Sequence, residues 1–276
     1  MGIYAVIGDP IGHTLSPAMH EFWYQRYGWD HRYIPLKVKA ADLVQAVHGL
    51  LALGVEGFNV TVPHKVAIMP FLDEVDAEAE RLGAVNTVIR SDDHFIGTNT
   101  DGLGFLNSID GNIHFKAGDR ALVIGAGGAA RAVGLSLAYH NGLPVDFTNR
   151  TVENAKRLSE EVNAITSSVL MTIADAEKRL SDYPLIINAT SVGMMPEPNQ
   201  IPMMLTGLTK GTLVVDLIYR PIKTRFLEEA EAHGCTIMNG LPMLIHQGAL
   251  AFKRWFNCAP DLKEMASFLV HQLQNS

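Results

Sequence analysis

The sequence predicts an α/β fold with two domains, the first of them discontinuous. Short apolar runs alternate with helical patterns along most of the chain, which is typical of sheets covered by helices. The pattern changes near Asp101, after a hairpin, and a regular strand–helix alternation begins at Ala121. Two helical patterns follow the last predicted strand, so we expect the end of the chain to pack back on the first part.

The first part is predicted to contain short strands linked by helices. Ser16 is a suitable N-cap and Pro17 a suitable first helical residue, so a helix should begin there and close at Gly28. The other predicted elements are strands at 3–7, 33–38 and 57–61, helices at 41–53, 64–71 and 75–82, and a hairpin of strands 87–90 and 94–97.

The second part begins with a connecting helix at 101–109 and then repeats strand and helix, which predicts a parallel sheet. Predicted strands cover 121–124, 145–148, 185–188, 213–217 and 236–238, and predicted helices cover 128–139, 152–162, 223–233, 242–256 and 262–273. We therefore expect residues 1–101 and 241–276 to form one domain, and residues 102–240 the other.

Composition narrows the class of protein. Of 276 residues, 47% are hydrophobic, which suits a packed core, and the net charge of −7 argues against nucleic acid or an anionic membrane as a partner. The two cysteines, Cys235 and Cys258, match no disulfide framework or metal motif and suit a reducing compartment. Because no signal-peptide pattern and no long apolar run is present, we expect a soluble, cytoplasmic protein without a metal site.

A glycine-rich turn indicates a cofactor. The apolar strand at 121–124 runs into Gly125-Ala126-Gly127-Gly128-Ala129-Ala130, which matches the pattern G-x-G-x-x-A. The first glycine permits a tight turn, the second lets the backbone approach a pyrophosphate, and the helix N-terminus offers N–H groups to the phosphates. The sequence thus predicts a Rossmann-like dinucleotide-binding domain; the alternative is a tight turn without a ligand.

The end of the next strand indicates which dinucleotide binds. NAD enzymes usually place an acid there to hold the ribose 2′-hydroxyl, but Asp146 comes early in this strand, and the strand is followed by Asn149, Arg150 and Thr151. A guanidinium can hold a 2′-phosphate with charge-assisted bonds, so Arg150 favours NADP over NAD. The alternative is that Arg150 is a solvated surface residue.

Polar side chains also gather in the first part, at the ends of predicted strands, where sites are often built. Thr14 and Ser16 stand two residues apart, so both hydroxyls can face one ligand, although Ser16 can also be a plain N-cap. Lys65 can exchange a proton or bind a carboxylate, and Asp101 is a candidate acid or a plain N-cap. The neutral candidates in this part are Asn59, Thr61 and Asn86.

Nine motifs, in order along nearly the whole chain, make the sequence resemble the shikimate dehydrogenase family. They are 10–17 (PIGHTLSP), 59–65 (NVTVPHK), 83–87 (GAVNT), 99–102 (NTDG), 125–130 (GAGGAA), 149–151 (NRT), 188–194 (NATSVGM), 216–221 (DLIYRP) and 240–247 (GLPMLIHQ).

The resemblance implies an NADP-dependent, reversible reduction of 3-dehydroshikimate to shikimate in aromatic amino-acid (chorismate) biosynthesis. It implies a substrate domain beside the Rossmann-like domain, a catalytic pair of Lys65 and Asp101, and a homodimer as an expected assembly. The residues it places around the substrate are Thr14, Ser16, Asn59, Thr61, Asn86, Tyr219 and Gln247. The residues it places around NADP(H) are Gly125, Ala126, Gly127, Gly128, Ala129, Asn149, Arg150, Thr151, Thr190, Met194, Leu217 and Gly240.

Two departures from the family pattern keep alternatives open. Thr14 stands where the family usually has serine, and its extra methyl group narrows the carboxylate pocket, which can retune shikimate against quinate. NADP-using members often carry a second basic residue after the 149–151 motif, whereas this chain has Glu153 and Asn154. The alternatives are a quinate/shikimate dehydrogenase that uses NAD, and a non-catalytic dinucleotide-binding regulator, against which the presence of both Lys65 and Asp101 argues.

Overall fold

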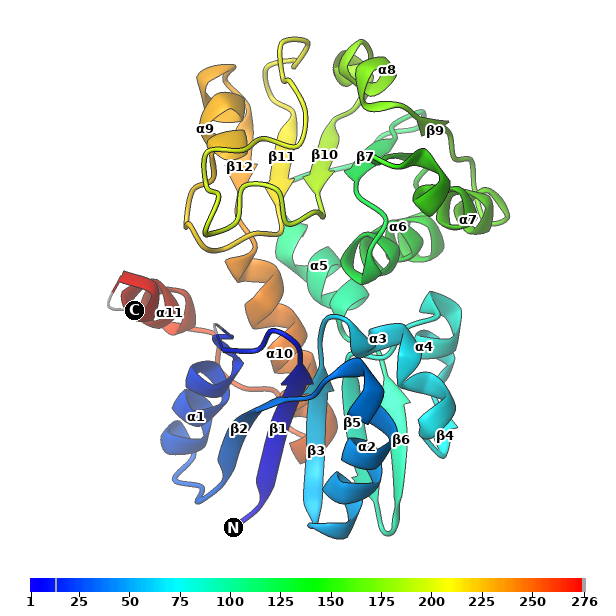
Figure 1. Ribbon diagram of the computed structural model, residues 1–276. Helices are drawn as coiled ribbons and strands as arrows, with labels where there is room; N and C mark the ends of the chain where they lie inside the picture. The colour runs from blue at the N-terminus through cyan, green and yellow to red at the C-terminus, as the bar shows by residue number, and fades with distance from the viewer. Residues whose placement is uncertain (13, 275–276) are drawn as a thin grey trace. The chain divides into compact units, whose positions relative to one another are not determined.

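The structure is a computed structural model that describes residues 1–12 and 14–274 (Figure 1). The chain forms two compact units. Unit 1 comprises Met1–Gly104 and Ile245–Gln272, and unit 2 comprises Phe105–Leu244 with the end of the chain from Leu273. Both boundaries fall within helices rather than in loops, namely α5 (Asp101–Ile109) and α10 (Leu241–Phe256).

Unit 1 is built on a six-stranded mixed sheet in the order β2-β1-β3-β5-β6-β4. β1 pairs in parallel with β2 and β3, whereas β5 runs antiparallel to β3 and to β6. The strands are β1 (Ile3–Gly8), β2 (Arg32–Lys37), β3 (Val55–Val60), β4 (Glu74–Val75), β5 (Thr87–Ser91) and β6 (His94–Thr98). The predicted hairpin is confirmed, and β4 is too short for its pattern to stand out in the sequence.

The helices of unit 1 lie on both faces of this sheet (Figure 1). They are α1 (Ser16–Arg26), η1 (Ala40–Asp42), α2 (Leu43–Ala52), α3 (His64–Ala67), η2 (Met69–Phe71), α4 (Ala77–Leu82) and α11 (Met265–Gln274), with parts of α5 and α10. Successive strand residues point to opposite faces, and one face packs against α2 in an apolar core that includes Ile7, Val47 and Phe58.

The other face carries an aromatic cluster, by which we mean Tyr4, His20, Trp23, Tyr24, Tyr33, Phe252, Trp255 and Phe256. The cluster attaches α10 to the first part of the chain. Trp255 donates from Nε1 to the backbone oxygen of Val88 at 3.0 Å, and Trp23 donates to that of Asp261 at 3.0 Å. Residues 245–272 thus belong to the same compact unit as the first part of the chain.

Two N-cap interpretations are wrong. α1 begins at Ser16 itself, with Leu15 at the cap position and no side-chain cap. Thr14 instead accepts a hydrogen bond from the backbone N–H of Ser16 at 3.3 Å. Asp101 is the first residue of α5, and its backbone N–H donates to Oδ1 of Asn99 at 2.9 Å. Because local capping is done by neighbouring side chains, those of Ser16 and Asp101 are directed to other contacts.

Unit 2 is built on a fully parallel sheet in the order β12-β11-β10-β7-β8-β9. The strands are β7 (Ala121–Ile124), β8 (Val145–Thr148), β9 (Leu170–Met171), β10 (Leu185–Asn188), β11 (Leu213–Asp216) and β12 (Thr236–Met238). The helices are α6 (Gly128–Asn141), α7 (Val152–Asn163), α8 (Ile173–Glu177), η3 (Leu180–Asp182) and α9 (Arg225–Ala232). The strand order reverses between β7 and β10, and such a switch point is where ligands bind in open α/β sheets.

The patterns missed β9, α8 and η3. β9 has two residues, η3 three and α8 five, which is too few for an alternating or a helical period to appear. η1 and η2 overlap the helices predicted at 41–53 and 64–71. Within residues 1–12 and 14–274, no helix has the length and apolar character needed to cross a membrane.

Candidate active site

The candidate catalytic pair lies within unit 1. Lys65, in α3, places Nζ 2.6 Å from Oδ2 of Asp101, at the start of α5. The two side chains are 16% and 7% exposed. Burying one charge alone is costly, whereas a close, hydrogen-bonded pair offsets much of that cost. The pair is therefore a charged group that is largely shielded from water.

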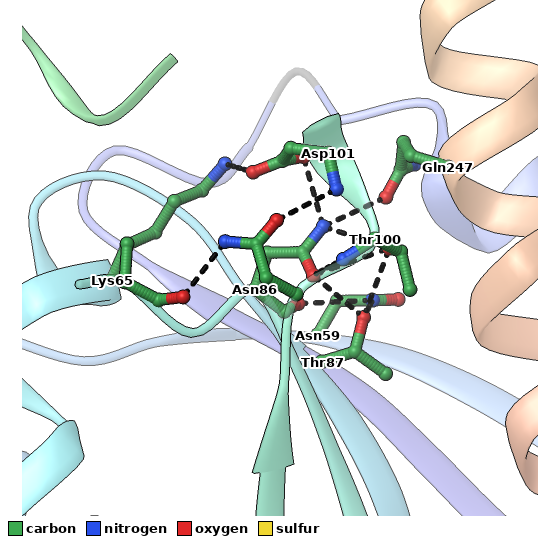
Figure 2. A network of polar contacts seen from close by, with 9 residues as sticks. Asn59, Lys65, Asn86, Thr87, Thr100, Asp101 and Gln247 are labelled. Atoms are coloured by element: carbon green, nitrogen blue, oxygen red, sulfur yellow. Dashed lines mark hydrogen bonds and ion pairs between the residues drawn. The ribbon is translucent and has the colours of Figure 1, made fainter. Parts of the chain in front are cut away.

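Asn86 connects this pair to a wider polar network (Figure 2). Its Nδ2 lies 2.8 Å from Oδ1 of Asp101, 2.9 Å from Oγ1 of Thr100 and 3.4 Å from Oε1 of Gln247. Its Oδ1 accepts from the backbone N–H of Thr100 at 2.7 Å and from the hydroxyl of Thr87 at 2.9 Å. The amide of Asn86 is thus held from both ends, and it holds the carboxylate of Asp101 in turn.

One end of the unit 1 sheet brings these residues together. β3 ends at Val60 and β6 at Thr98, while β5 begins at Thr87 because it runs antiparallel to both. The register places Thr87 opposite both Asn59 and Thr98. The residues that follow or precede these strand ends therefore meet, although they are up to about forty residues apart in the chain.

The hydroxyl residues lie at the same end of the sheet. Thr14 donates from Oγ1 to Oγ of Ser16 at 3.2 Å. Thr61 follows β3, and a Cβ added at Gly8, at the end of β1, would lie 2.5 Å from its methyl group. The absence of a side chain at Gly8 therefore lets Thr61 sit directly beside β1.

Most of the predicted substrate residues are thus assembled in unit 1, whereas Tyr219 is in unit 2, in the loop after β11, where burial raises its pKa above 10. Sequence reasoning missed Thr87 and Thr100, although both lie in motifs that it singled out. It also missed Tyr33, whose hydroxyl donates to Oδ1 of Asn59 at 2.6 Å. No motif contains Tyr33, so only the tertiary structure reveals it.

The glycine-rich turn of unit 2 fits a dinucleotide. Gly125 has φ +119°, which side chains rarely adopt, so the turn requires glycine there. By contrast, a Cβ added at Gly127 would meet no atom within 4 Å. Packing does not explain the second glycine, whereas close approach of a ligand to the backbone does. The N-terminus of α6 has no side-chain cap and no acid in its first turn, which suits a bound phosphate.

The end of β8 presents Arg150 rather than an acid. Arg150 is exposed, and among the described residues no ion-pair partner of it is found. Asp146, the acid within β8, is fully buried and accepts from Arg120 at 2.7 and 2.8 Å and from Tyr183 at 2.7 Å. Asp146 is therefore held in the interior of unit 2 and is not free to bind the ribose of NAD.

The other predicted cofactor residues lie beyond the ends of β10, β11 and β12. Thr190 donates from its backbone and hydroxyl to Oδ1 of Asn188 at 3.0 and 2.7 Å. The backbone N–H of Leu217 donates to the backbone oxygen of Asn188 at 3.0 Å, and the backbone N–H of Gly240 donates to the backbone oxygen of Ile218 at 3.0 Å. Met194 lies in the loop after β10 and is exposed.

A buried carboxylate, which the sequence did not single out, joins these loops. Asp216 accepts from Asn188 at 3.0 Å, from the backbone N–H of Ile218 at 3.0 Å and from Thr224 at 2.6 Å. Burial raises the pKa of Asp216 to about 6, although these three donors oppose the shift. The side chain therefore holds the ends of β10 and β11 and the start of α9 together.

A parallel sheet with a ligand-ready glycine turn, accompanied by a unit that holds a shielded lysine–aspartate pair, defines the class: a two-domain dehydrogenase that uses a nicotinamide dinucleotide. Among the described residues, no group of three or more His, Cys, Asp or Glu side chains is placed to hold a metal.

Comparison with known proteins gives the family. Family models described as shikimate dehydrogenase substrate binding domain, shikimate/quinate 5-dehydrogenase and shikimate 5'-dehydrogenase C-terminal domain match residues 6–88, 111–231 and 240–267. A shikimate dehydrogenase (NADP(+)) of Bacillus cereus is 44% identical over 272 residues, which is 98% of each chain. The chain belongs to the shikimate dehydrogenase family.

Solved structures agree with this assignment. Shikimate 5-dehydrogenase of Thermus thermophilus, in complex with NADP(H) and shikimate, is 38% identical with a TM-score of 0.89, covering 98% of this chain and 99% of that one. Quinate dehydrogenase of Corynebacterium glutamicum, in complex with NAD, is 30% identical with a TM-score of 0.89, covering 98% and 99%. The predicted fold class, with a substrate domain and a Rossmann-like domain, is confirmed.

Proposed function

We propose that this chain is an NADP-dependent shikimate dehydrogenase, which interconverts 3-dehydroshikimate and shikimate in aromatic amino-acid biosynthesis. The observation that carries the proposal is the 2.6 Å contact of Lys65 with Asp101, within a network of neutral amides and hydroxyls. A regulator that only binds a dinucleotide would gain nothing from such a pair, because a partly buried ion pair adds little to the stability of a fold.

Neutral donors suit a substrate that carries one carboxylate and several ring hydroxyls. In the proposal, Thr14 and Ser16 bind the carboxylate, and the ring contacts Thr61, Asn86, Tyr219 and Gln247. Asn59 has both amide hydrogens directed at protein acceptors, the backbone oxygen of Asn86 at 3.1 Å and the hydroxyl of Thr87 at 3.0 Å. It therefore acts mainly by supporting these neighbours.

The reaction moves a hydride to a ring carbonyl carbon and a proton to the carbonyl oxygen. Bound NADPH supplies the hydride. The ammonium group of Lys65 stabilises the charge that develops on the oxygen and donates the proton to it; in the reverse direction its amine removes that proton. Asp101 orients Lys65, and Asn86 holds the second oxygen of Asp101 at 2.8 Å. The pair is thus prepared before substrate binds.

The cofactor site that we propose lies in unit 2. The backbone N–H groups of the turn at 125–130 would bind the pyrophosphate, and Arg150 the 2′-phosphate, with Asn149 and Thr151 beside it. Thr190, Met194, Leu217 and Gly240 would contact the rest of the molecule. Arg150 is exposed, so its contribution is that of a solvated, charge-assisted contact.

The proposal extends to the setting of the enzyme. A cytoplasmic location suits Cys235 and Cys258, neither of which is in a disulfide. The expected partner is a small-molecule substrate, and the expected assembly is a homodimer, which light scattering in solution would test.

Kinetics of Lys65→Ala, with Lys39→Ala as a matched control at an exposed position, test the proposed chemistry. We expect kcat to fall by about 10² or more in Lys65→Ala and to stay unchanged in the control. Unchanged turnover of Lys65→Ala would remove this residue from the mechanism.

A matrix of shikimate and quinate with NADP and NAD tests the substrate and cofactor. A higher kcat/KM for quinate with NAD would favour the quinate alternative. The observation that favours this alternative is Thr14, which stands where the family usually has serine. No turnover with any combination would favour the regulator.

A further inference from the structure

Tyr33 is a buried hydroxyl residue that takes no part in the proposed chemistry. It lies in β2 and is 2% exposed. Its ring stacks on that of His20, with centroids 4.5 Å apart and an interplanar angle of 5°. Both rings belong to the aromatic cluster, so the direction of the Tyr33 hydroxyl is set by packing and not by solvent.

The hydrogen bonds around Asn59 determine which way each donor points. Nδ2 of Asn59 lies 3.1 Å from the backbone oxygen of Asn86, which can only accept. Oδ1 must therefore face the other way, toward the hydroxyl of Tyr33 at 2.6 Å. Since Oδ1 also only accepts, Tyr33 has to donate its single hydrogen to Asn59.

The direction continues beyond Asn59. Its two amide hydrogens go to the backbone oxygen of Asn86 at 3.1 Å and to the hydroxyl of Thr87 at 3.0 Å. Thr87 in turn donates to Oδ1 of Asn86 at 2.9 Å. The result is a directional chain of hydrogen bonds from Tyr33 through Asn59 to Asn86 and Thr87 (the part from Asn59 in Figure 2).

We infer that Tyr33 is a positioning residue for substrate binding: its hydroxyl fixes the amide of Asn59 and so holds Asn86 in place in the network around Asp101. This inference rests on the proposed function, which places Asn86 against the substrate ring. At 2% exposure, Tyr33 is too deeply buried to touch a ligand, so it acts through Asn59.

Burial raises the pKa of Tyr33 well above 10. The hydroxyl therefore stays protonated, and remains a donor to Asn59, across the pH range in which a dehydrogenase is assayed. Neutral His20 beside it adds no charge, because burial lowers its pKa to about 3.

Tyr33→Phe is the direct test, and the chain offers a matched control in Tyr24→Phe. Tyr24 lies in the same cluster at 1% exposure, and its hydroxyl has no hydrogen-bond partner within the described residues. Both variants remove one buried oxygen and keep the ring, but only Tyr33→Phe interrupts the directional chain of hydrogen bonds. The measurements are steady-state kinetics with shikimate and NADP, and urea unfolding followed by tryptophan fluorescence.

For Tyr33→Phe we expect KM for shikimate to rise about tenfold, the effect of losing about one well-placed hydrogen bond. We expect kcat to stay within about threefold and KM for NADP to be unchanged. Tyr24→Phe should match the wild type in KM for shikimate, in kcat and in KM for NADP. A purely structural role would lower the amount of active enzyme, and hence apparent kcat, without a selective change in KM for shikimate.

A double variant sharpens the test. If Tyr33 acts through Asn59, Asn59→Ala/Tyr33→Phe should raise KM by less than the product of the two single effects. Full multiplicativity, or a Tyr33→Phe enzyme with the KM of the wild type, overturns the inference while the proposed function stands. A folded wild-type protein that turns over no shikimate overturns the proposed function, and the inference with it.

Discussion

His20 predicts a specific weakness of unit 1 toward acid. The imidazole is fully buried in the aromatic cluster, and neither ring nitrogen has a hydrogen-bond partner among the described residues. Burial lowers the pKa of His20 from 6.5 to about 3. The fold therefore accepts only the neutral ring, while the unfolded chain is free to take up a proton.

The sign and size of the effect follow from proton linkage. Because the folded pKa of a base is depressed, its contribution to stability is complete above pH 6.5 and is lost as the pH falls toward 3. At pH 5 the unfolded chain has bound almost one proton at this site and the folded unit almost none. This difference lowers the free energy of unfolding by about 2 kcal/mol relative to pH 7.5.

The perturbation is His20→Phe, which keeps an aromatic ring against Tyr33 and removes both unpaired nitrogens. All three tryptophans, Trp23, Trp29 and Trp255, are in unit 1, so their fluorescence in urea reports this unit. Between pH 7.5 and 5 the variant should lose about 2 kcal/mol less than the wild type.

The control is His48→Gln, which removes an exposed histidine of α2 and should follow the wild type. Equal losses in the wild type and His20→Phe would refute the reasoning, because they would mean that His20 is hydrated or partnered in solution.

Two further predictions concern unit 2. Arg150→Ala should raise KM for NADPH about tenfold and leave KM for NADH unchanged, since a charge-assisted contact to a 2′-phosphate is lost; equal effects on both, or the same effect in the exposed control Lys156→Ala, would contradict the role of Arg150. Asp216 has a raised pKa of about 6, so the folded state binds the proton more tightly and stability should rise by about 1.4 kcal/mol as the pH falls from 7.5 to 5. Hydrogen exchange of β10 and β11 in Asp216→Asn should lack this gain, and a gain retained in the variant would assign it to another group.

Several elements have the bounds that the sequence predicted. These include β7, β8 and β10. β7 is apolar throughout, as expected of a strand that is buried on both faces of a parallel sheet. The helix at Asp101–Ile109 was also predicted with its observed bounds. By contrast, the role of Ser16 at the start of α1 was misjudged, since the helix begins at Ser16 itself and Leu15 takes the cap position.

The candidate site was likewise predicted only in part from the sequence. Lys65 and Asp101 carry chemistry that a sequence makes visible, but their 2.6 Å contact depends on where an antiparallel strand returns to the end of β3. The sequence set Asp146 aside as a ribose contact because it comes early in its strand, and the tertiary structure shows what it does instead, which is to bind Arg120 and Tyr183.

The sequence by itself determined the class of fold, the glycine turn and the residues able to exchange protons or bind anions, because period, turn chemistry and side-chain type are local properties. Only the tertiary structure decided which polar atoms satisfy one another. The hydrogen bonds from Tyr33 to Asn59, and those that Asp216 accepts from Asn188 and Thr224, all join residues from separate elements. A buried donor must find an acceptor wherever the fold brings one, and that partner is set by packing and not by position in the chain.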